Sequence, residues 1–441
     1  MKGFPVSGDI SNTRLGRRSF LGALGVGAAA VGSPTLLSSC SVKGTETSSS
    51  AVLKIGLVSP QTGALSSFAA SDNYVVKTVQ DALRNGFKAG GQTRKVEIVV
   101  KDSQSSPTRA TEVTKELITR DGVDMIVASS TPDTANPVAD QCEIDGIPNT
   151  TTIVPWQSWY YGRGGEPGGE GFKYGTNFYS GMFEFADSYA AMMNRLDGGS
   201  KKIATVWPND TDGNAFRDGV GPFFKDQGYA LIDGGDYQNG TADYAAMINR
   251  FKSEDAEFLN AIPIPPDWQT FWKQSASLNY QPRFATVAKS MLFPSEAEAL
   301  GRLAENLAVC VWWTDTLPYT SSLDGTTAAA LATNYTAQTG QQWTQALGSL
   351  YSLFEVAVEA FKAADDPKDK EDVADKLQNL RYEGVSGPLD FTNGPEKGIA
   401  VIKCVGGQWR PGKRFPYEVV VVDNSTNGDF PLGGDLQPLR S

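Results

Sequence analysis

The sequence predicts an α/β protein with two parallel sheets, and three observations lead to this prediction. Short apolar strand patterns alternate with helical stripes. The alternation occurs twice, in one series that begins at residue 53 and in another that begins at residue 201. The chain has 441 residues, which is more than one compact core usually holds. Because strand–helix alternation places helices on both faces of a parallel sheet, each series predicts one lobe.

The first series alternates strand and helix patterns three times. The expected strands are 53–59, 96–101 and 124–128. The expected helices are 72–88, 108–120 and 133–145, where apolar residues recur at three- or four-residue spacing. A further strand is expected at 149–153. The segment 155–174, rich in Gly, Trp and Tyr, is a poor strand or helix candidate, and we predict a loop beside a cleft.

The second series is longer and ends in a mixed region. Its expected strands are 203–207, 230–233, 256–261, 284–287 and 307–312. Its expected helices lie near 213–227, 241–252, 267–279 and 294–304. Further helices are expected near 325–339, 343–364 and 369–381, followed by short strands near 389–391, 399–404 and 418–422.

The composition excludes several functions. With no histidine, the chain cannot use Ser-His-Asp or Cys-His catalysis, and the commonest zinc sites are also excluded. It has no GxxxxGKS/T phosphate loop, so it is not itself an ATPase. Its 39 basic and 50 acidic residues give a net charge of −11, which argues against nucleic acid as a partner. We expect neither an enzyme nor a bound cofactor or metal.

The first 40 residues have the features of an export signal. Arg17 and Arg18 open a twin-arginine pattern, and an apolar run of small residues follows from 21 to 31. Leu37-Ser38-Ser39-Cys40 resembles a lipobox, in which the cysteine is acylated and becomes the new N-terminus. We therefore expect a signal peptide over 1–40, a lipid anchor on Cys40, and a Ser- and Thr-rich tether over 41–52.

Three cysteines remain once Cys40 carries lipid: Cys142, Cys310 and Cys404. Because three is odd, at most one internal disulfide can form, and the sequence does not say which.

Three segments together resemble a known family. Residues 53–63 (LKIGLVSPQTG), 99–107 (VVKDSQSSP) and 121–131 (DGVDMIVASST) are similar, in this order, to the first three strand–turn units of the type I periplasmic binding proteins of branched-chain amino-acid transporters. The similarity runs from about 53 to 422 and rests on the ordered set rather than on any single motif.

The resemblance implies two Rossmann-like lobes that are joined by a multi-strand hinge, with the ligand between them. Lobe 1 would comprise 53–175 and 313–388. Lobe 2 would comprise 176–312 and 389–441.

The first candidate binding element is Ser129-Ser130-Thr131, which follows a strand and opens a helix. Free N–H groups at a helix N-terminus attract a carboxylate or another acceptor, and hydroxyls beside them add hydrogen bonds. The matching turn in the family holds the ligand carboxylate. The alternative is ordinary capping of the helix by Thr131 or Asp133.

Two aromatic residues are candidates for the walls of the cleft. Phe68 matches a family aromatic residue that lines the cleft from the first loop. Trp156 follows the strand at 149–153, at a place where the family has small residues, and it could stack on a planar ligand. The alternative for both side chains is packing within their own loops.

The second lobe departs from the family pattern. Amino-acid binders hold the ligand ammonium with a carboxylate near the end of a second-lobe strand, and Lys289 stands at that place here. Either Asp212 or Asp267 replaces the carboxylate, or the ligand has no ammonium. Lys289 could also be a solvated loop residue. From Trp156 and Lys289 we expect a ligand other than a simple branched-chain amino acid.

Taken together, the sequence predicts the exported, lipid-anchored substrate-binding protein of an ABC importer. The expected ligand is a small polar organic solute, such as an amino-acid-like compound, an amide or an organic acid. The expected protein partner is a membrane permease, and the place is the outer face of the cytoplasmic membrane or the periplasm. A ligand-sensing receptor subunit of the same fold is the alternative.

Overall fold

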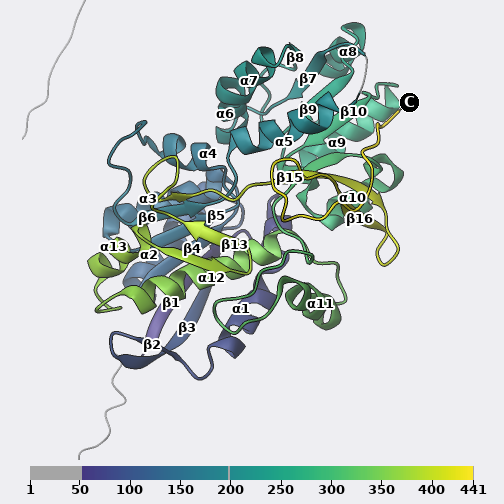
Figure 1. Ribbon diagram of the computed structural model, residues 1–441. Helices are drawn as coiled ribbons and strands as arrows, with labels where there is room; N and C mark the ends of the chain where they lie inside the picture. Colours follow the sequence, from purple (N-terminus) through teal and green to yellow (C-terminus); the bar gives the residue numbers. More distant parts are fainter. Residues whose placement is uncertain (1–51, 197–198, 441) are drawn as a thin grey trace, which may run out of the picture. The chain divides into compact units, whose positions relative to one another are not determined.

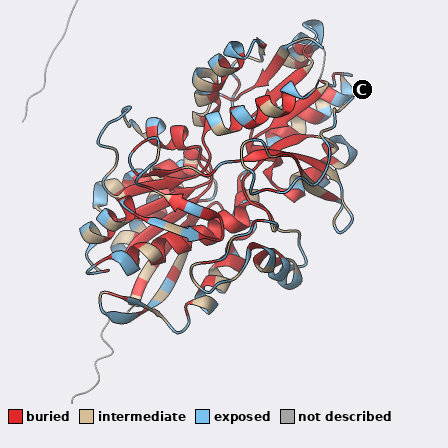
Figure 2. Ribbon diagram, viewed as in Figure 1, coloured by how far each residue is buried: buried red, intermediate tan, exposed pale blue. Residues whose placement is uncertain are grey.

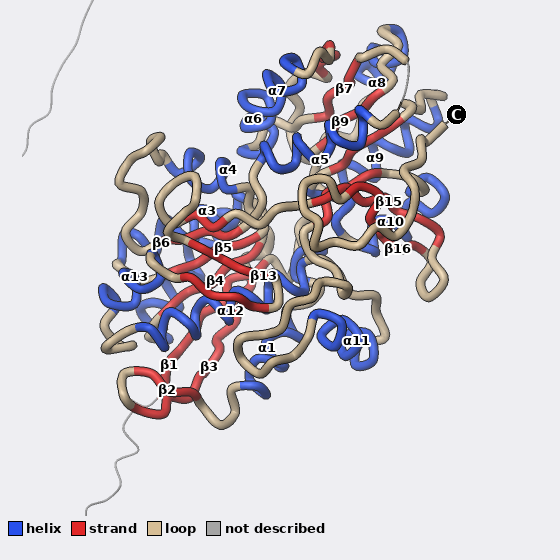
Figure 3. Tube along the Cα trace, in the orientation of Figure 1, coloured by secondary structure: helices blue, strands red, loops and turns tan. Residues whose placement is uncertain are grey.

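The structure is a computed structural model that describes residues 52–196 and 199–440. The predicted signal peptide, the lipobox and Cys40 lie outside these residues. The described part contains two seven-stranded sheets and one two-stranded sheet. Helices and strands alternate along most of the chain, and each large sheet is the centre of one lobe (Figures 1 and 3).

The first lobe is built on the sheet with the order β14-β6-β5-β4-β1-β3-β2. Its strands are β1 (Val52–Ser59), β2 (Phe87–Ala89), β3 (Gln92–Asp102), β4 (Met125–Ser129), β5 (Asn149–Thr152), β6 (Gly175–Phe178) and β14 (Ile399–Ala400). All neighbours pair in parallel except β2, which pairs antiparallel with β3 at the edge. The predicted parallel sheet is therefore confirmed, with one antiparallel edge strand.

The second lobe is built on the sheet with the order β16-β15-β11-β10-β9-β7-β8. Its strands are β7 (Lys202–Val206), β8 (Ala230–Asp233), β9 (Phe258–Ala261), β10 (Phe284–Val287), β11 (Ala308–Val311), β15 (Val405–Pro411) and β16 (Tyr417–Asp423). The five strands β7 to β11 pair in parallel, and β15 and β16 continue the sheet antiparallel. The two-stranded sheet is β12 (Arg381–Gly384) with β13 (Gly387–Asp390).

Helices cover both sheets (Figure 1). Those of the first lobe are α1 (Asp72–Ala82), α2 (Pro107–Glu116), α3 (Pro132–Asp145), α4 (Trp156–Tyr160), α12 (Ala346–Ala363) and α13 (Lys370–Gln378). α12 packs against α1, β4 and β5, while α2 packs against α3. Nearly every residue of α12 is buried, which explains its long apolar sequence (Figure 2).

The helices of the second lobe are α5 (Met182–Asn194), α6 (Thr211–Ala215), α7 (Gly221–Asp226), α8 (Ala245–Ser253), α9 (Pro265–Ser277) and α10 (Pro294–Leu300). α5 packs against β11, β15 and β16, and α9 packs against α8 and α10. α11 (Ala328–Thr339) packs against α12. Within the two described ranges, no helix combines the length and the apolar character that a bilayer span requires.

Three segments cross between the lobes: 179–181 after β6, 312–327 after β11, and 401–404 after β14. The first and third crossings are hydrogen-bonded to each other. Tyr179 N donates to Ala400 O at 3.1 Å, and Ile402 N donates to Tyr179 O at 3.4 Å. The rings of Tyr179 and Trp312 meet edge to face at 5.0 Å, so the second crossing packs on the first. This is the arrangement of a multi-strand hinge.

Two local expectations are wrong. The helix expected over 72–88 ends at Ala82, because the chain turns at Gly86, whose φ of +74° favours glycine, and enters β2. The expected loop at 155–174 contains α4 and a short 3₁₀ turn. Trp156 and Trp159 are buried there, because this segment packs on α3 rather than standing in solvent.

The last lobe boundary also differs from the expected one. We expected the second lobe to resume at residue 389, with a strand over 399–404. Instead β14 pairs with β6, so the chain stays in the first lobe until the crossing at 401–404. The short run of two paired residues explains why the sequence did not indicate which sheet this strand joins.

Candidate functional site

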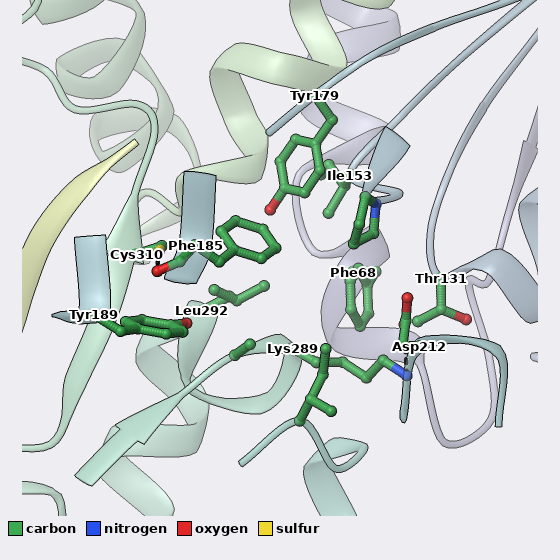
Figure 4. Close-up of a pocket in the computed structure, with 13 residues that line it drawn as sticks. Phe68, Thr131, Ile153, Tyr179, Phe185, Tyr189, Asp212, Lys289, Leu292 and Cys310 are labelled. Carbon is green, nitrogen blue, oxygen red and sulfur yellow. Dashed lines mark hydrogen bonds and ion pairs between the residues drawn. The ribbon is translucent and has the colours of Figure 1, made fainter. Parts of the chain in front are cut away.

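A small cavity lies where the two lobes meet (Figure 4). Its volume is about 20 Å³, enough for roughly one water molecule. The residues that line it are Phe68, Thr131, Ile153, Pro155, Tyr179, Phe185, Tyr189, Asp212, Ile262, Ala288, Lys289, Leu292 and Cys310. The first four belong to lobe 1, Tyr179 belongs to a crossing, and the others belong to lobe 2. An organic ligand therefore enters only when the lobes separate or side chains rearrange.

The first-lobe side of the cavity is the turn between β4 and α3. Ser129 ends the strand, Pro132 opens the helix, and Thr131 holds the N-cap position with extended backbone angles. Yet the Thr131 side chain makes no capping hydrogen bond. The hydroxyls of Ser129, Ser130 and Thr131 are all buried and have no hydrogen-bond partner among the described residues. Buried hydroxyls are normally paired, so this turn offers donors and acceptors to a ligand.

Apolar and aromatic side chains form most of the wall. Phe68 comes from the turn Ser66–Ala69, and its ring lies 4.8 Å from that of Phe293 in the other lobe. Phe185 and Tyr189, one turn apart on α5, complete the wall on the second-lobe side (Figure 4). Such a lining suits the apolar body of a small solute.

A buried ion cluster occupies the polar end of the cavity. Lys289 Nζ lies 3.0 Å from Asp210 Oδ2 and 2.8 Å from Asp212 Oδ2. The Lys289 side chain is 4% exposed, and the side chains of Asp210 and Asp212 are 6% and 2% exposed. The idea that Lys289 is a solvated loop residue is wrong. Two carboxylates neutralise its charge, so Lys289 does not face the cavity as an unpaired cation.

The pKa shifts follow from this geometry. Burial alone would lower the pKa of Lys289, but attraction to Asp210 and Asp212 outweighs it and raises the pKa. Burial raises the pKa of Asp212 to about 6, although Lys289 opposes this. Burial also favours a higher pKa for Asp210, but the charge of Lys289 and the hydrogen bond from Gly213 N–H outweigh it and lower the pKa.

A third carboxylate borders the cluster from lobe 1. Burial raises the pKa of Asp133, which senses the charges of both Lys289 and Asp210. Thr211 Oγ1 donates to Asp133 Oδ1 at 3.3 Å and so joins α6 to α3 across the lobe junction. Ser67 Oγ in lobe 1 donates to Glu296 Oε1 in lobe 2 at 2.9 Å. Both hydrogen bonds join the two lobes.

Two cavity residues have unusual backbone angles. Ile153 directly follows β5 and has φ of +62°, while Lys289 follows β10 and has φ of +60°. The left-handed region is costly for side chains other than glycine, above all for a β-branched one such as Ile153. Backbone strain of this kind gathers at ligand sites, where the surrounding structure holds it in place. Among the residues that line the cavity, it occurs once in each lobe, after a parallel strand.

The remaining candidates lie beside the cavity rather than in its wall. Trp156 packs in the first-lobe cluster with Trp159, and its neighbour Pro155 takes the lining position. Both carboxylate oxygens of Asp267 accept from Gly240 N at 3.0 Å, so this side chain is used within its own lobe. Of the two possible replacements for the family carboxylate, Asp212 is the one that lines the cavity.

Some site residues were not foreseen. Asp210 stands in the same turn as Asp212, and its role as partner of Lys289 had no sequence signal because 79 residues separate the two. Tyr179, Phe185 and Tyr189 line the cavity from the crossing and from α5. A strand prediction for β6 would have placed Tyr179 at its carboxyl end, which is the usual ligand edge of a parallel sheet.

Within the described ranges, no group of three or more Cys, Asp or Glu side chains has an arrangement that could hold a metal ion. The polar atoms at the cavity instead suit an organic molecule. Asp212 Oδ1 is buried and has no hydrogen-bond partner in the part of the chain that the structure describes. Together with Thr131 it gives the cavity a polar end opposite the aromatic wall.

Two α/β lobes, three crossings and a cavity lined from both sides define a hinged solute-binding protein. Comparison of the sequence with protein families agrees. The family described as periplasmic binding protein matches residues 52–412, and the chain belongs to this family. The family consists of solute-binding proteins rather than enzymes.

Several solved structures have the same fold. For three of them, the region that matches this protein spans nearly the whole of the solved chain. The leucine-binding protein of Thermotoga maritima is 18% identical to this protein, with a TM-score of 0.69, and the match covers 86% of this chain and 99% of the solved chain. The branched-chain amino-acid binding protein of Streptococcus pneumoniae, solved with isoleucine, has 17% identity and a TM-score of 0.67, covering 84% and 99%. A solute-binding protein of Rhodopseudomonas palustris, solved with 3,4-dihydroxybenzoic acid, has 17% identity and a TM-score of 0.66, covering 84% and 98%.

Proposed function

We propose that the protein is the substrate-binding component of an ABC importer and that it holds a small polar organic solute in the interlobe cavity. The observation that carries this proposal is the pairing of unsatisfied polar atoms with an apolar wall. Thr131 Oγ1 from one lobe and Asp212 Oδ1 from the other are buried without partners in the described residues, and both belong to the cavity lining. A solute that contacts both atoms would stabilise the closed arrangement of the lobes.

The ion cluster changes the expected chemistry of that solute. Asp210 and Asp212 neutralise Lys289, so its charge gives no reason to expect that it repels a ligand ammonium. Asp212 Oδ1 has no hydrogen-bond partner among the described residues and can accept one from a ligand, which favours a ligand with an N–H donor. The ligand class that we propose is amino-acid-like or amide, ahead of an organic acid. Branched-chain amino acids are therefore included rather than excluded.

The test of this site uses two subsite variants. Native mass spectrometry of protein purified without added ligand first identifies a retained solute, and isothermal calorimetry then measures its affinity. Ser130→Ala with Thr131→Ala removes the first-lobe hydroxyls, and Asp212→Asn removes the charge at the second-lobe acceptor. Each should weaken binding by about 1–3 kcal/mol, as hydrogen bonds to charged groups contribute. Trp156→Phe, outside the lining, is the matched control. If both variants fold and bind the solute with unchanged affinity, these side chains do not contact the ligand and their role is structural.

Closure of the lobes is the second part of the proposal. Because the cavity of about 20 Å³ is smaller than an organic solute, binding requires an open form that closes around the ligand. Small-angle scattering should show a smaller radius of gyration once the identified solute saturates the protein. An identical radius in both conditions would contradict hinge closure.

Export and anchoring are the third part. Arg17, Arg18 and the lipobox-like Leu37-Ser38-Ser39-Cys40 support a twin-arginine lipoprotein signal. In the cell, Cys40→Ala should move the protein from the membrane fraction to the soluble fraction. Arg17→Lys with Arg18→Lys should block export. Membrane fractionation that is the same for wild type and Cys40→Ala would disprove the anchor.

A further inference from the structure

The interlobe cavity has further polar groups at the end that lies away from Thr131 and Asp212. Tyr189 on α5 and Cys310 in β11 both line the cavity. Figure 4 shows these two side chains together on one side, whereas Thr131 and Asp212 lie on the other side. The ring of Phe185 lies between the two sides (Figure 4). We call Tyr189 and Cys310 the far end of the cavity.

The course of α5 places the far end deep in the second lobe. The helix begins at Met182, whose N–H donates to Gln157 Oε1 of the first lobe at 2.8 Å. The N-terminus of α5 therefore stands at the lobe junction. Tyr189 follows two turns later, about 10 Å along the helix axis. Cys310 belongs to β11, an internal strand of the second sheet. The far end is thus built by lobe 2 alone.

The hydroxyl of Tyr189 is buried and unpaired. The residue is 0% exposed, and Tyr189 Oη has no hydrogen-bond partner in the described part of the chain. Cys310 is a buried free thiol, and its sulfur lies 4.0 Å from Phe185 O. Because buried tyrosine hydroxyls usually have a hydrogen-bond partner, an unpaired one in the wall of a cavity is available to a ligand.

The surroundings of this hydroxyl are neutral. Burial raises the pKa of Tyr189 most. The next contributions to this pKa come from the thiols of Cys310 and Cys404 and from the Tyr179 hydroxyl, which are all uncharged groups at neutral pH. The ring of Phe185 stacks on that of Tyr189 at 6.4 Å. A charged ligand group would lose its hydration here without meeting an opposite charge, and such burial is costly. A neutral donor or acceptor suits the far end better.

We propose that the solute has two hydrogen-bonding ends, an amino-acid-like end at Thr131 and Asp212 and a neutral hydroxyl, carbonyl or amide group that bonds to Tyr189. This inference rests on the proposed function, because it assigns the second end of the same ligand. The ligand class is amino acids and related compounds with a neutral polar side chain. An aliphatic side chain leaves the Tyr189 hydroxyl unpaired, and an acidic or basic one buries a charge beside it. Tyr189 is therefore the residue that sets specificity.

The test compares amino acids of matched size by isothermal calorimetry. The pairs are leucine with asparagine, methionine with glutamine, and phenylalanine with tyrosine, and the second member of each carries the neutral polar group. Both members present the same ammonium and carboxylate, so the end at Thr131 and Asp212 contributes equally. In the pair that binds best, the polar member should bind about tenfold more tightly, which is the effect of one buried hydrogen bond. Glutamate should bind more weakly than glutamine.

Two variants assign this preference to one hydroxyl. Tyr189→Phe keeps the ring and should remove the preference, so that both members of the pair bind equally well. Tyr351→Phe is the matched control, because Tyr351 on α12 is also 0% exposed and its hydroxyl is also unpaired among the described residues, but it lies outside the cavity lining. This control should keep the preference. If Tyr189→Phe does not fold, the pairs measured on the wild type decide alone.

The outcomes separate this inference from the proposed function. If an aliphatic or charged amino acid binds at least as tightly as its neutral polar partner, the inference is overturned and the binding function stands. An unchanged preference in folded Tyr189→Phe would overturn the role of Tyr189. If no member of the panel binds to the wild type, the amino-acid-like ligand class and this inference are overturned together.

Discussion

Removal of the Lys289 ammonium, as in Lys289→Met, should strongly destabilise the second lobe. The ammonium lies 3.0 Å and 2.8 Å from two carboxylates, and its side chain is 4% exposed. At an effective dielectric of about 20, each contact corresponds to roughly 6 kcal/mol of Coulomb attraction, before desolvation and the repulsion between the carboxylates are subtracted. Measured losses on removing one partner of a buried pair are about 3–5 kcal/mol. We expect a loss in this range near neutral pH.

Protonation of Asp212 limits the share of that loss that comes from Asp212, and it makes the loss depend on pH. In the variant this carboxyl can take up a proton, and neutralising a group with an ordinary pKa of 3.8 costs about 5 kcal/mol at about pH 7.5 but only about 1.6 kcal/mol at about pH 5. The destabilisation should therefore shrink as the pH falls. The lost attraction involves Asp210 as well, so some loss should remain at low pH.

The assay is urea unfolding followed by tryptophan fluorescence, at about pH 7.5 and about pH 5. The double variant Lys289→Met with Asp212→Asn is the matched control, and it should recover part of the stability at the higher pH. A loss below about 1 kcal/mol at both pH values would refute the buried ion cluster. A loss that is the same at both pH values would refute the role of Asp212 protonation.

The remaining predictions concern groups outside the cavity. Glu355→Leu removes the acceptor of the Ser322 and Val385 N–H groups. Each unsatisfied donor should lower the free energy of unfolding, measured in urea, by about 1–3 kcal/mol. A variant as stable as the wild type would show that water replaces the carboxylate. Burial raises the pKa of Glu355 to about 7, so the native state keeps this proton to a higher pH than the unfolded state does. The stability of the wild type should therefore fall as the pH rises from about 4.5 to about 7. Glu355→Gln should flatten this dependence on pH. Gly348→Val places a side chain against the Trp313 ring and should lower the thermal midpoint through overpacking of about 1–3 kcal/mol, and an unaltered midpoint would contradict the close contact.

The strand–helix alternation made most of the fold predictable. β1, β4 and β9 are short apolar runs, and α12 is a long one, so periodicity and length identify them. β6 was missed because its sequence, GTNF, contains two polar residues that hydrogen-bond to the neighbouring strand inside the core. β15 was missed because it begins VGGQ, and adjacent glycines weaken a strand pattern.

The candidate site was predictable in place but not in detail. Thr131, Asp212 and Lys289 each follow a parallel strand, and carboxyl ends of parallel strands meet at the ligand edge of a sheet, so their convergence follows from the strand assignments. The ion pair of Lys289 with Asp210 could not be inferred, since it depends on which turn residues face inward. Trp156 shows the opposite error, because an aromatic residue beside a cleft can equally pack into its own lobe.

The third crossing has a consequence for biosynthesis. β11 is an internal strand of the second sheet only because β15 returns to pair with it after α11, α12, α13 and β14 have been made. Until the last forty or so residues leave the ribosome, β11 exposes an unpaired apolar edge, and such edges invite pairing with other chains. A chain that is cut before residue 405 should therefore aggregate rather than fold as a first lobe with a partial second one. The third crossing, 401–404, joins β14 of the first sheet to β15 of the second, so it takes its place only after both strands have been made.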